Sequence, residues 1–383
     1  MPPKTKFDYI IVGAGASGLM LAYKMANDRF FDDKSIIIID KEKKFYNDRT
    51  WCFWEEENGN WDEIVKKSWK QFFFKSDTLD RQESIHPYQY KMIRSSDFYY
   101  KVWKTLEVKT NFTFFKDKVS TIFQEKENAK VVTLNHTFYS KNVINSILFS
   151  DDFTKQVKYP VLQQHFLGFF IKTKEDAFDN NVATFMDFAI PQKGNTRFMY
   201  ILPFSKREAL FEYTLFSSEL LSYNDYKKGI ENYLKEKGIC DYQIVEKEQG
   251  SIPMTCYKFW NVNSKNRINI GTAGGWSKPS TGFTFKNTMK NTSDLINHLK
   301  TKKELDKFYK RTRFWYYDLL LLDILHEKNH LGATIFGNMF KNNQPQKILK
   351  FLDEETNFVE DLQIQLKMPP YEFVRALMKR LFK

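Results

Sequence analysis

The chain has 383 residues, enough for two or three domains around a large core. Apolar residues make up 42% of it and 37 residues are Phe, which excludes disordered, collagen-like and low-complexity classes. Cys52, Cys240 and Cys256 lack any CxxC spacing, and the six His residues are isolated. The sequence therefore predicts no metal site and no disulfide scaffold, and a reducing, cytoplasmic environment is the simplest interpretation.

Lys and Arg total 59 against 47 Asp and Glu, which leaves a net charge of +12. This charge favours an anionic partner, either nucleic acid or a phospholipid surface, or it belongs to an ordinary lysine-rich solvated surface. Nothing resembles a nucleic-acid-binding module, so we expect no nucleic-acid partner. No apolar run reaches the ~20 residues of a bilayer-spanning helix. The nearest, residues 314–325, contains Asp318 and Asp323.

The first 40 residues predict one βαβ unit. Residues 9–12 (YIIV) and 36–39 (IIII) have the pattern of short buried strands. Between them, the glycine-rich string GAGASG at 13–18 leads into a helix over residues 19–26. A strand, a glycine-rich turn and a helix in this order indicate a dinucleotide-binding unit.

Each glycine of this turn has an expected role. Gly13 permits a tight turn, Gly15 lets a pyrophosphate approach the backbone, and Gly18 lets the helix pack closely on the strand. The helix N-terminus then offers free N–H groups to the phosphates. Asp40, at the tip of the second strand, is placed to accept hydrogen bonds from a ribose. The motif by itself does not distinguish FAD from NAD.

The remaining chain predicts a β-rich middle and a helical end, in an α/β fold. We expect a discontinuous cofactor-binding domain over residues 1–160 and 250–300, a β-rich substrate domain over 161–249, and a helical region over 301–383. The individual elements expected are a helix over 98–106 capped by Ser95-Ser96-Asp97, β patterns over 112–123 and 130–148, a strand meander over 163–217, a helix over 222–237 and a strand over 267–270.

Several strings resemble one known family, in order and over nearly the whole chain. The most specific is DRTWCFW at 48–54, and GTAGGWSKPSTGF at 271–283 resembles a second flavin-contacting segment. With these strings the chain resembles the FAD-dependent lycopene cyclases of the bacterial lycopene β-cyclase type. The other matching strings are GAGASG at 13–18, FMDF at 185–188, YILPFS at 200–205 and FEYTLFS at 211–217.

The resemblance implies a Rossmann-like FAD-binding fold, similar to the aromatic hydroxylases and geranylgeranyl reductases. It implies an isomerase that closes the ψ-ends of lycopene, or of a related acyclic carotene, into β-ionone rings. Such an enzyme uses reduced FAD, takes NAD(P)H as reductant, makes no net redox change, and lies in the cytoplasm at the inner membrane. A monooxygenase or prenyl reductase of related fold is the alternative. The oligomeric state stays open.

The resemblance also implies which residues contact the cofactor. Related flavoproteins carry Gly-Asp in the second segment, where Thr272 stands here; its hydroxyl can still donate and accept hydrogen bonds. The implied contacts are Gly13, Gly15, Ala16, Gly18, Asp40, Lys41, Gly271, Thr272, Gly274, Gly275 and Gly282. We expect the glycines and the turn at 279–282 to present backbone N–H groups and a helix start toward the flavin.

Ring closure begins with protonation of a carbon–carbon double bond, which requires an acid in a dry cavity. In the strand at 210–216 both faces are mainly apolar, so we expect Glu212 to be shielded and its pKa raised. The resemblance makes Glu212 the acid; the alternative is a salt-bridged or edge-facing Glu. Asp187, in another apolar strand, would orient Glu212, remove the final proton, or serve an ordinary structural hydrogen bond.

Two further groups of residues attract notice, one as a candidate cavity lining and one as a string that only superficially resembles an acidic cyclase motif. Trp51, Phe53 and Trp54 would line the cavity and stabilise a cation, or are simply core residues. The acidic string at 351–356 (FLDEET) is interpreted as a solvated helix face.

The C-terminus predicts a basic amphipathic helix. This helix suits an anionic membrane interface, with docking on the protein's own core as the alternative. Its apolar positions are Val374, Leu377, Met378, Leu381 and Phe382, and its basic positions are Arg375, Lys379, Arg380 and Lys383.

Overall fold

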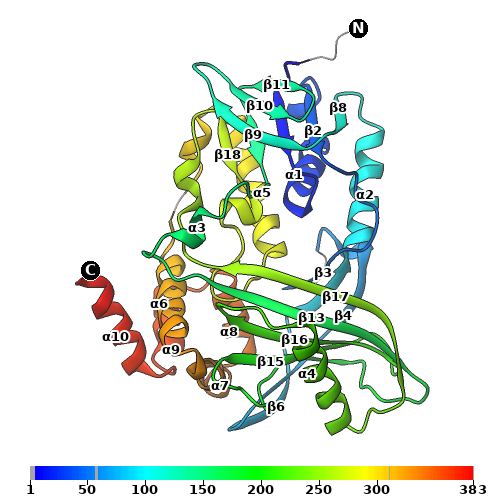
Figure 1. The fold of residues 1–383 in the computed structure, drawn as a ribbon, viewed down its shortest axis with the longest axis vertical. Helices are drawn as coiled ribbons and strands as arrows, with labels where there is room; N and C mark the ends of the chain where they lie inside the picture. The colour runs from blue at the N-terminus through cyan, green and yellow to red at the C-terminus, as the bar shows by residue number, and fades with distance from the viewer. Residues whose placement is uncertain (1–4, 57–58, 310, 383) are drawn as a thin grey trace.

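The computed structural model describes residues 5–56, 59–309 and 311–382 (Figure 1). Its upper half in Figure 1 holds a five-stranded, all-parallel sheet. The predicted βαβ unit forms its centre. The strands, in the order in which they pair, are β18 (Arg267–Asn269), β12 (Val143–Asn145), β1 (Tyr9–Val12), β2 (Ile36–Asp40) and β8 (Phe112–Lys116).

The run of four Ile in β2 is explained by two buried faces. Ile36 and Ile38 pack in a core with helices α1 (Ala16–Ala26), α2 (Ser95–Glu107) and α5 (Phe285–Lys300). Ile37 and Ile39 pack on the other face, against a small antiparallel sheet. Because both faces are covered, the strand is apolar at every position. The small sheet contains β9 (Val119–Gln124), β10 (Ala129–Thr133) and β11 (Thr137–Ser140).

A seven-stranded sheet occupies the lower half of Figure 1. One face is covered by α4 (Tyr223–Glu236), whose residues form a core with Phe211, Tyr213 and Leu215; we name it the α4 face. The opposite face carries Leu210, Glu212 and Phe216, and we name it the cavity face. The strands are β17 (Tyr242–Met254), β13 (Leu162–Thr173), β16 (Glu208–Ser217), β15 (Thr196–Pro203), β14 (Val182–Asp187), β5 (Gln71–Ser76) and β6 (Leu79–Ser84).

The predicted domain boundary between residues 160 and 161 does not follow the sheets. Strands β5 and β6 come from the first 100 residues, yet β5 pairs in parallel with β14 and extends the seven-stranded sheet. A pairing between strands so distant in sequence leaves no local signal. Whether residues 1–160 and 161–249 fold as separate domains stays a prediction. A third sheet contains β3 (Thr50–Glu55), β7 (Gln89–Arg94) and β4 (Val65–Trp69).

The end of the chain is helical, as predicted, and packs in one large core with the cavity face of the seven-stranded sheet. In the described ranges, no helix is both long enough and apolar enough to cross a bilayer. Helix α10 (Pro370–Leu381) lies at the edge of the molecule (Figure 1). The remaining helices are α3 (Asp152–Lys155), α6 (Arg313–Glu327), α7 (Gly332–Asn342), α8 (Pro345–Leu352) and α9 (Phe358–Gln365).

Candidate active site

One cavity of about 400 Å³ joins the glycine-rich turn to the cavity face of the seven-stranded sheet. Gly15, Ala16 and Ser17 line it at one end, and Glu212 and Glu248 line it on the sheet. This volume lies within the range of small-molecule and cofactor sites. Two parts of the chain that the sequence analysis treated separately therefore border the same space.

The glycine-rich turn has the geometry that its sequence predicts. Gly13 has a φ of +98°, and a Cβ on it would overlap the Ser146 hydroxyl. A Cβ on Gly18 would overlap the carbonyl oxygen of Gly13, so this glycine permits the close packing. A Cβ on Gly15 would meet nothing within 4 Å, which leaves open space beside the backbone at the start of α1. That helix has no side-chain cap and no acidic residue in its first turn, so its N-terminus can receive an anion.

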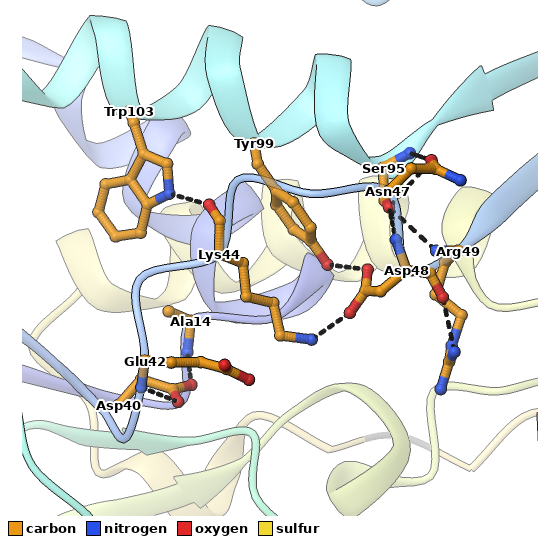
Figure 2. Close-up of polar contacts among 10 residues, drawn as sticks. All are labelled: Ala14, Asp40, Glu42, Lys44, Asn47, Asp48, Arg49, Ser95, Tyr99 and Trp103. Atoms are coloured by element: carbon orange, nitrogen blue, oxygen red, sulfur yellow. Dashed lines mark hydrogen bonds and ion pairs between the residues drawn. The ribbon is translucent and has the colours of Figure 1, made fainter.

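Asp40 contacts the same turn from the end of β2 (Figure 2). Its Oδ2 accepts a hydrogen bond from the Ala14 N–H at 2.5 Å, and its Oδ1 accepts one from the Glu42 N–H at 3.2 Å. Neither Asp40 nor the exposed Lys41 lines the cavity. Asp40 therefore holds the turn, and its contact with a ribose stays a prediction.

The loop between β2 and β3 contributes cavity residues that the sequence analysis missed. Lys44, Asp48 and Arg49 line the cavity, and Lys44 Nζ lies 2.5 Å from Asp48 Oδ2. Helix α2 holds this loop in place (Figure 2). The Tyr99 hydroxyl donates to Asp48 Oδ1 at 2.9 Å, and Trp103 Nε1 donates to the Lys44 carbonyl at 3.0 Å.

Ser95 explains part of the polar string with which α2 begins. The predicted cap at 95–97 is wrong: Arg94 is the cap residue and the helix begins at Ser95, without a side-chain cap. The Ser95 hydroxyl instead accepts the N–H groups of Asp48 and Arg49, at 2.9 and 3.0 Å (Figure 2). The Ser95 hydroxyl does accept backbone N–H groups, but these belong to the loop before β3 and not to its own helix.

The second predicted cofactor segment forms a short 3-10 helix, Gly271–Gly274, followed by a turn. Thr272 and Gly282 line the cavity, whereas Gly271, Gly274 and Gly275 do not. Gly271, Gly275 and Gly282 have positive φ values of +60°, +72° and +71°, so all three serve the loop conformation itself.

The predicted presentation of N–H groups by this segment is wrong for four of its residues. The N–H groups of Thr281 and Gly282 donate to the Lys278 carbonyl, at 3.2 and 2.8 Å, and those of Gly274 and Gly275 also donate within the loop. A tight turn satisfies its own donors first. Helix α5 does begin beside the cavity, at Phe285.

Four buried polar atoms on the cavity wall have no hydrogen-bond partner among the described residues. Buried polar groups are nearly always hydrogen-bonded in native proteins, so such a cluster points to a polar ligand or water. A Cβ on Gly282 would overlap one of them, the amide oxygen of Gln164. The atoms are Thr50 Oγ1, Gln164 Oε1, Glu248 Oε2 and Thr281 Oγ1.

Glu212 lies on the cavity wall in the middle of β16, within the apolar strand that the sequence predicts. The Thr214 hydroxyl donates to its Oε1 at 2.7 Å. Removal from water raises the pKa of Glu212 to about 8, the negative charge of Glu248 adds in the same direction, and the hydrogen bond from Thr214 opposes both. A carboxyl group in this environment holds its proton at neutral pH, as a proton donor must.

Glu212 stands in a row of directly paired residues that crosses four strands. Tyr200 on β15 pairs with Glu212, Glu212 pairs with Gly168 on β13, and Gly168 pairs with Glu248 on β17. Paired residues of an antiparallel sheet point to the same face. The register therefore brings a second carboxyl group, Glu248, to the wall of the cavity. Sequence reasoning missed it, because the surrounding string KEQGS has no apolar alternation.

Asp187 lies elsewhere, although the sequence analysis named it as a second catalytic carboxyl. It is 1% exposed on the α4 face; its Oδ2 accepts from the Tyr233 hydroxyl at 2.7 Å and its Oδ1 from the Ala189 N–H at 2.9 Å. The pairing of β14 shifts register between Thr184 and Asp187, and this irregularity turns Asp187 away from the cavity. Of the roles considered, the structural hydrogen bond fits this position.

The family model of lycopene cyclase proteins matches residues 8–378. The chain belongs to the lycopene cyclase family. The resemblance found in the sequence motifs is confirmed by this match, which covers nearly the whole chain. Among curated proteins, none matches the sequence significantly.

Solved structures with the same fold include flavoproteins and related enzymes. A geranylgeranyl bacteriochlorophyll reductase-like protein from Thermoplasma acidophilum has a TM-score of 0.62 at 14% identity, over 98% of this chain and 99% of that one. A flavoprotein/dehydrogenase from Cytophaga hutchinsonii has a TM-score of 0.65 at 12% identity, over 98% and 100%. A p-nitrophenol 4-monooxygenase from Pseudomonas putida has 0.59 at 12%, over 97% and 99%. The predicted α/β fold with a Rossmann-like core is thus confirmed.

Of the three aromatic residues predicted to line the site of this lycopene cyclase family member, Trp51 does so. Its ring stacks on Phe285, with the centroids 5.3 Å apart. Phe53 and Trp54 are buried in the two large cores instead, and neither lines the cavity. For these two, the interpretation as core residues holds.

The acidic string at 351–356 is buried in part, so its interpretation as a solvated helix face is wrong. Trp54 Nε1 donates to Asp353 Oδ2 at 2.7 Å, and Lys286 pairs with the same carboxylate. Burial raises the pKa of Asp353 to about 6. Glu354 pairs with the buried Lys278 at 3.2 Å. This string therefore ties the C-terminal helices to the loop beside the cavity.

Helix α10 carries its apolar stripe toward solvent. Leu381 is 67% exposed and Phe382 82%, and Val374, Leu377 and Met378 are also exposed. The basic side chains face the protein: Arg380 pairs with Asp323 and Lys379 with Glu327, both on α6. The alternative of docking on the core is confirmed in part: α10 packs on the large core through Ala376 and Phe373 and pairs with α6, while its predicted apolar stripe stays outside this contact. Lys383 lies outside the described residues.

Proposed function

We propose that the protein is a lycopene β-cyclase, which closes the ψ-ends of lycopene into β-ionone rings without net redox change. Membership of the lycopene cyclase family supports an enzyme that acts on carotenoids. The observation that carries the proposal is the position of Glu212, because a carboxyl group with a pKa raised to about 8 lines the same cavity as the dinucleotide turn. Such a group can protonate a terminal double bond and begin ring closure.

FAD is the proposed cofactor, with NAD(P)H as its reductant. The open space at Gly15, the bare N-terminus of α1 and Lys44 suit a pyrophosphate, and the unpartnered atoms of Gln164 and Thr281 suit a polar ring. When bound and reduced, the flavin would supply negative charge that stabilises a cation. We expect Gly15→Ala to fold normally but to purify with less flavin, by absorbance, than the wild type.

The cavity also suits a cationic intermediate formed from an apolar chain. The rings of Trp51, Tyr90 and Phe185 line it together with Phe216. Aromatic faces contribute on the order of 1–2 kcal/mol each to cation binding in a desolvated site, and they offer no nucleophile that would capture the cation.

A membrane surface is the proposed source of the substrate, at the cytoplasmic side of the inner membrane, because carotenes dissolve in lipid rather than in water. On the neighbouring segment of the chain, α9, Phe358 is 60% and Val359 63% exposed as well. An exposed apolar stripe on a positively charged protein suits an anionic bilayer. We therefore expect α9 and α10 to contact the lipid.

Liposome binding tests this contact. Replacing both Leu377 and Leu381 by Ser should weaken binding to anionic phosphatidylglycerol vesicles about tenfold or more, because each buried Leu contributes roughly 1.5–3 kcal/mol. Leu134→Ser is the matched control, since Leu134 is as exposed as Leu381 but lies between β10 and β11. Equal binding of both variants would remove the membrane proposal.

Pigment chromatography from a lycopene-accumulating bacterial host tests the proposed reaction. We expect β-carotene, and any γ-carotene left would report closure of one end only. Unchanged lycopene, with the protein folded and carrying flavin, would favour the redox alternative, a monooxygenase or prenyl reductase. That alternative consumes NAD(P)H in proportion to product, whereas a cyclase does not.

A further inference from the structure

Two carboxyl groups share the cavity wall, and a glycine stands between them. Gly168 pairs with Glu212 on one side and with Glu248 on the other, so the two glutamate backbones are two strand spacings apart, roughly 10 Å. A Cβ on Gly168 would lie 3.8 Å from the Cβ of Glu212 and 2.9 Å from Leu210 Cδ1. Glycine at position 168 therefore leaves room for the Leu210 side chain, which also lines the cavity.

Burial raises the pKa of both groups, but the charges beside them have opposite signs. Glu248 Oε1 accepts the Thr50 N–H at 2.9 Å. Burial raises the pKa of Glu248, and this hydrogen bond together with the positive charges of Arg49 and Arg94 opposes part of that increase. At Glu212 the neighbouring charge is negative, so the proton is retained. The neighbouring charges therefore favour the proton on Glu212 rather than on Glu248, as an acid and base pair requires.

Glu248 also has a free acceptor on the cavity side. It is 8% exposed, and its Oε2 is buried without a hydrogen-bond partner among the described residues, in a side chain that lines the cavity. An ionised carboxylate with one oxygen anchored and the other open can receive a proton without moving its backbone.

We propose that Glu248 is the second catalytic residue of the site and takes the proton that leaves the ring at the end of cyclisation. The inference rests on the proposed function. The Glu212 proton forms a C–H bond at the terminal double bond, and the electrons of a neighbouring double bond form the ring C–C bond, which leaves a ring cation. A C–H bond beside the cation breaks, its electron pair forms the ring double bond, and its proton binds Glu248. Transfer of one proton from Glu248 back to Glu212 completes the cycle.

The other polar groups near this position do not suit the role. Burial raises the pKa of the Cys52 thiol to about 12 and the pKa values of Tyr90 and Tyr200 well above their usual range, so all three stay neutral. Asp187 lies on the α4 face. The charged groups that face Glu248 from the neighbouring segments are Arg49 before β3, Arg94 on β7 and Glu212 on β16.

Variants at position 248 test the proposal in purified enzyme with reduced FAD and lycopene in vesicles. We expect Glu248→Gln to bind flavin and to slow β-ring formation by about 10²–10⁴-fold, with partial recovery in Glu248→Asp. Glu208→Gln is the matched control, since Glu208 stands on the same strand as Glu212 but pairs with Lys172 at the surface. Its rate should equal that of the wild type.

The pH profile separates catalysis by Glu248 from a structural effect. The wild-type rate should fall at low pH, where Glu248 gains a proton, and this acidic limb should disappear from the residual activity of Glu248→Gln. The alkaline limb should also move to lower pH, because the negative charge that raises the pKa of Glu212 is gone. A Glu248→Gln enzyme with the rate and profile of the wild type would overturn the role of Glu248. A wild type that leaves lycopene unchanged would overturn the proposed function itself.

Discussion

The two faces of the seven-stranded sheet both bury polar side chains, but these side chains differ in how many of their polar atoms are hydrogen-bonded. On the α4 face, Asp187 accepts two hydrogen bonds, and the His165 ring lies within hydrogen-bond distance of the hydroxyls of Tyr226 and Ser217, at 2.5 and 2.6 Å. On the cavity face, Glu248 and Gln164 each leave a buried oxygen unpartnered. Similar burial thus accompanies complete pairing on one face and incomplete pairing on the other.

This difference separates structural polar groups from those available for chemistry. A buried group whose hydrogen bonds are complete stabilises one conformation and has nothing left to offer a ligand. His165 illustrates the first kind, since burial lowers its pKa to about 4 and keeps it neutral. Glu212 illustrates the second, because its raised pKa stores a proton beside open space. Glu212 borders the cavity, whereas Asp187 is enclosed by its hydrogen-bond partners on the α4 face.

The largest expected effect is that of Glu212→Gln on the proposed cyclisation. Without the proton donor, the rate should fall by about 10²–10⁴-fold or below detection, while flavin remains bound. The matched variant on the other face is Asp187→Asn, whose folded fraction should cyclise at the wild-type rate. The measurement is β-carotene formed per unit of folded, flavin-loaded protein. Full activity in Glu212→Gln would remove the assignment of the acid.

A smaller effect is expected from pH alone. Because the pKa of Glu212 is raised to about 8, the carboxyl group is protonated below that pH and loses its proton above it. The protonated form is the active one, so the wild-type rate should decline by about tenfold per unit above pH 8. Initial rates from pH 6 to 10, with folding followed by circular dichroism, provide the measurement. A constant rate up to pH 10 would contradict the role of Glu212 as a protonated donor.

The smallest effect on activity and the clearest effect on stability should come from the α4 face. Tyr233→Phe removes the hydroxyl that donates to Asp187 and leaves a buried carboxylate oxygen with one partner fewer. The free energy of unfolding should fall by about 1–3 kcal/mol, measured by urea denaturation. Its pH–rate profile should match that of the wild type. A shifted pH–rate profile with an unchanged free energy of unfolding would contradict the structural role given to the α4 face.

Local patterns were sufficient for the glycine turn and for Glu212. The spacing of Gly13, Gly15 and Gly18 between two apolar strands predicts a geometry that depends only on neighbouring residues. The apolar residues on both sides of Glu212 predict its shielding in the same way. The prediction of a catalytic role for Asp187 is not supported, because an irregularity in β14 turns its side chain to the α4 face. No residue pattern in the sequence indicates this irregularity.

The sequence by itself determined the family, the βαβ unit and the acid candidate, because each depends on residues close together in the chain. Only the tertiary structure decided which carboxyl groups share a cavity. Glu248 meets Glu212 through the register of β17, β13 and β16. The tertiary structure also decided that α10 turns its apolar stripe outward, because the partners of its basic residues lie on α6. Pairing between distant segments is a property of the folded chain, and no single segment encodes it.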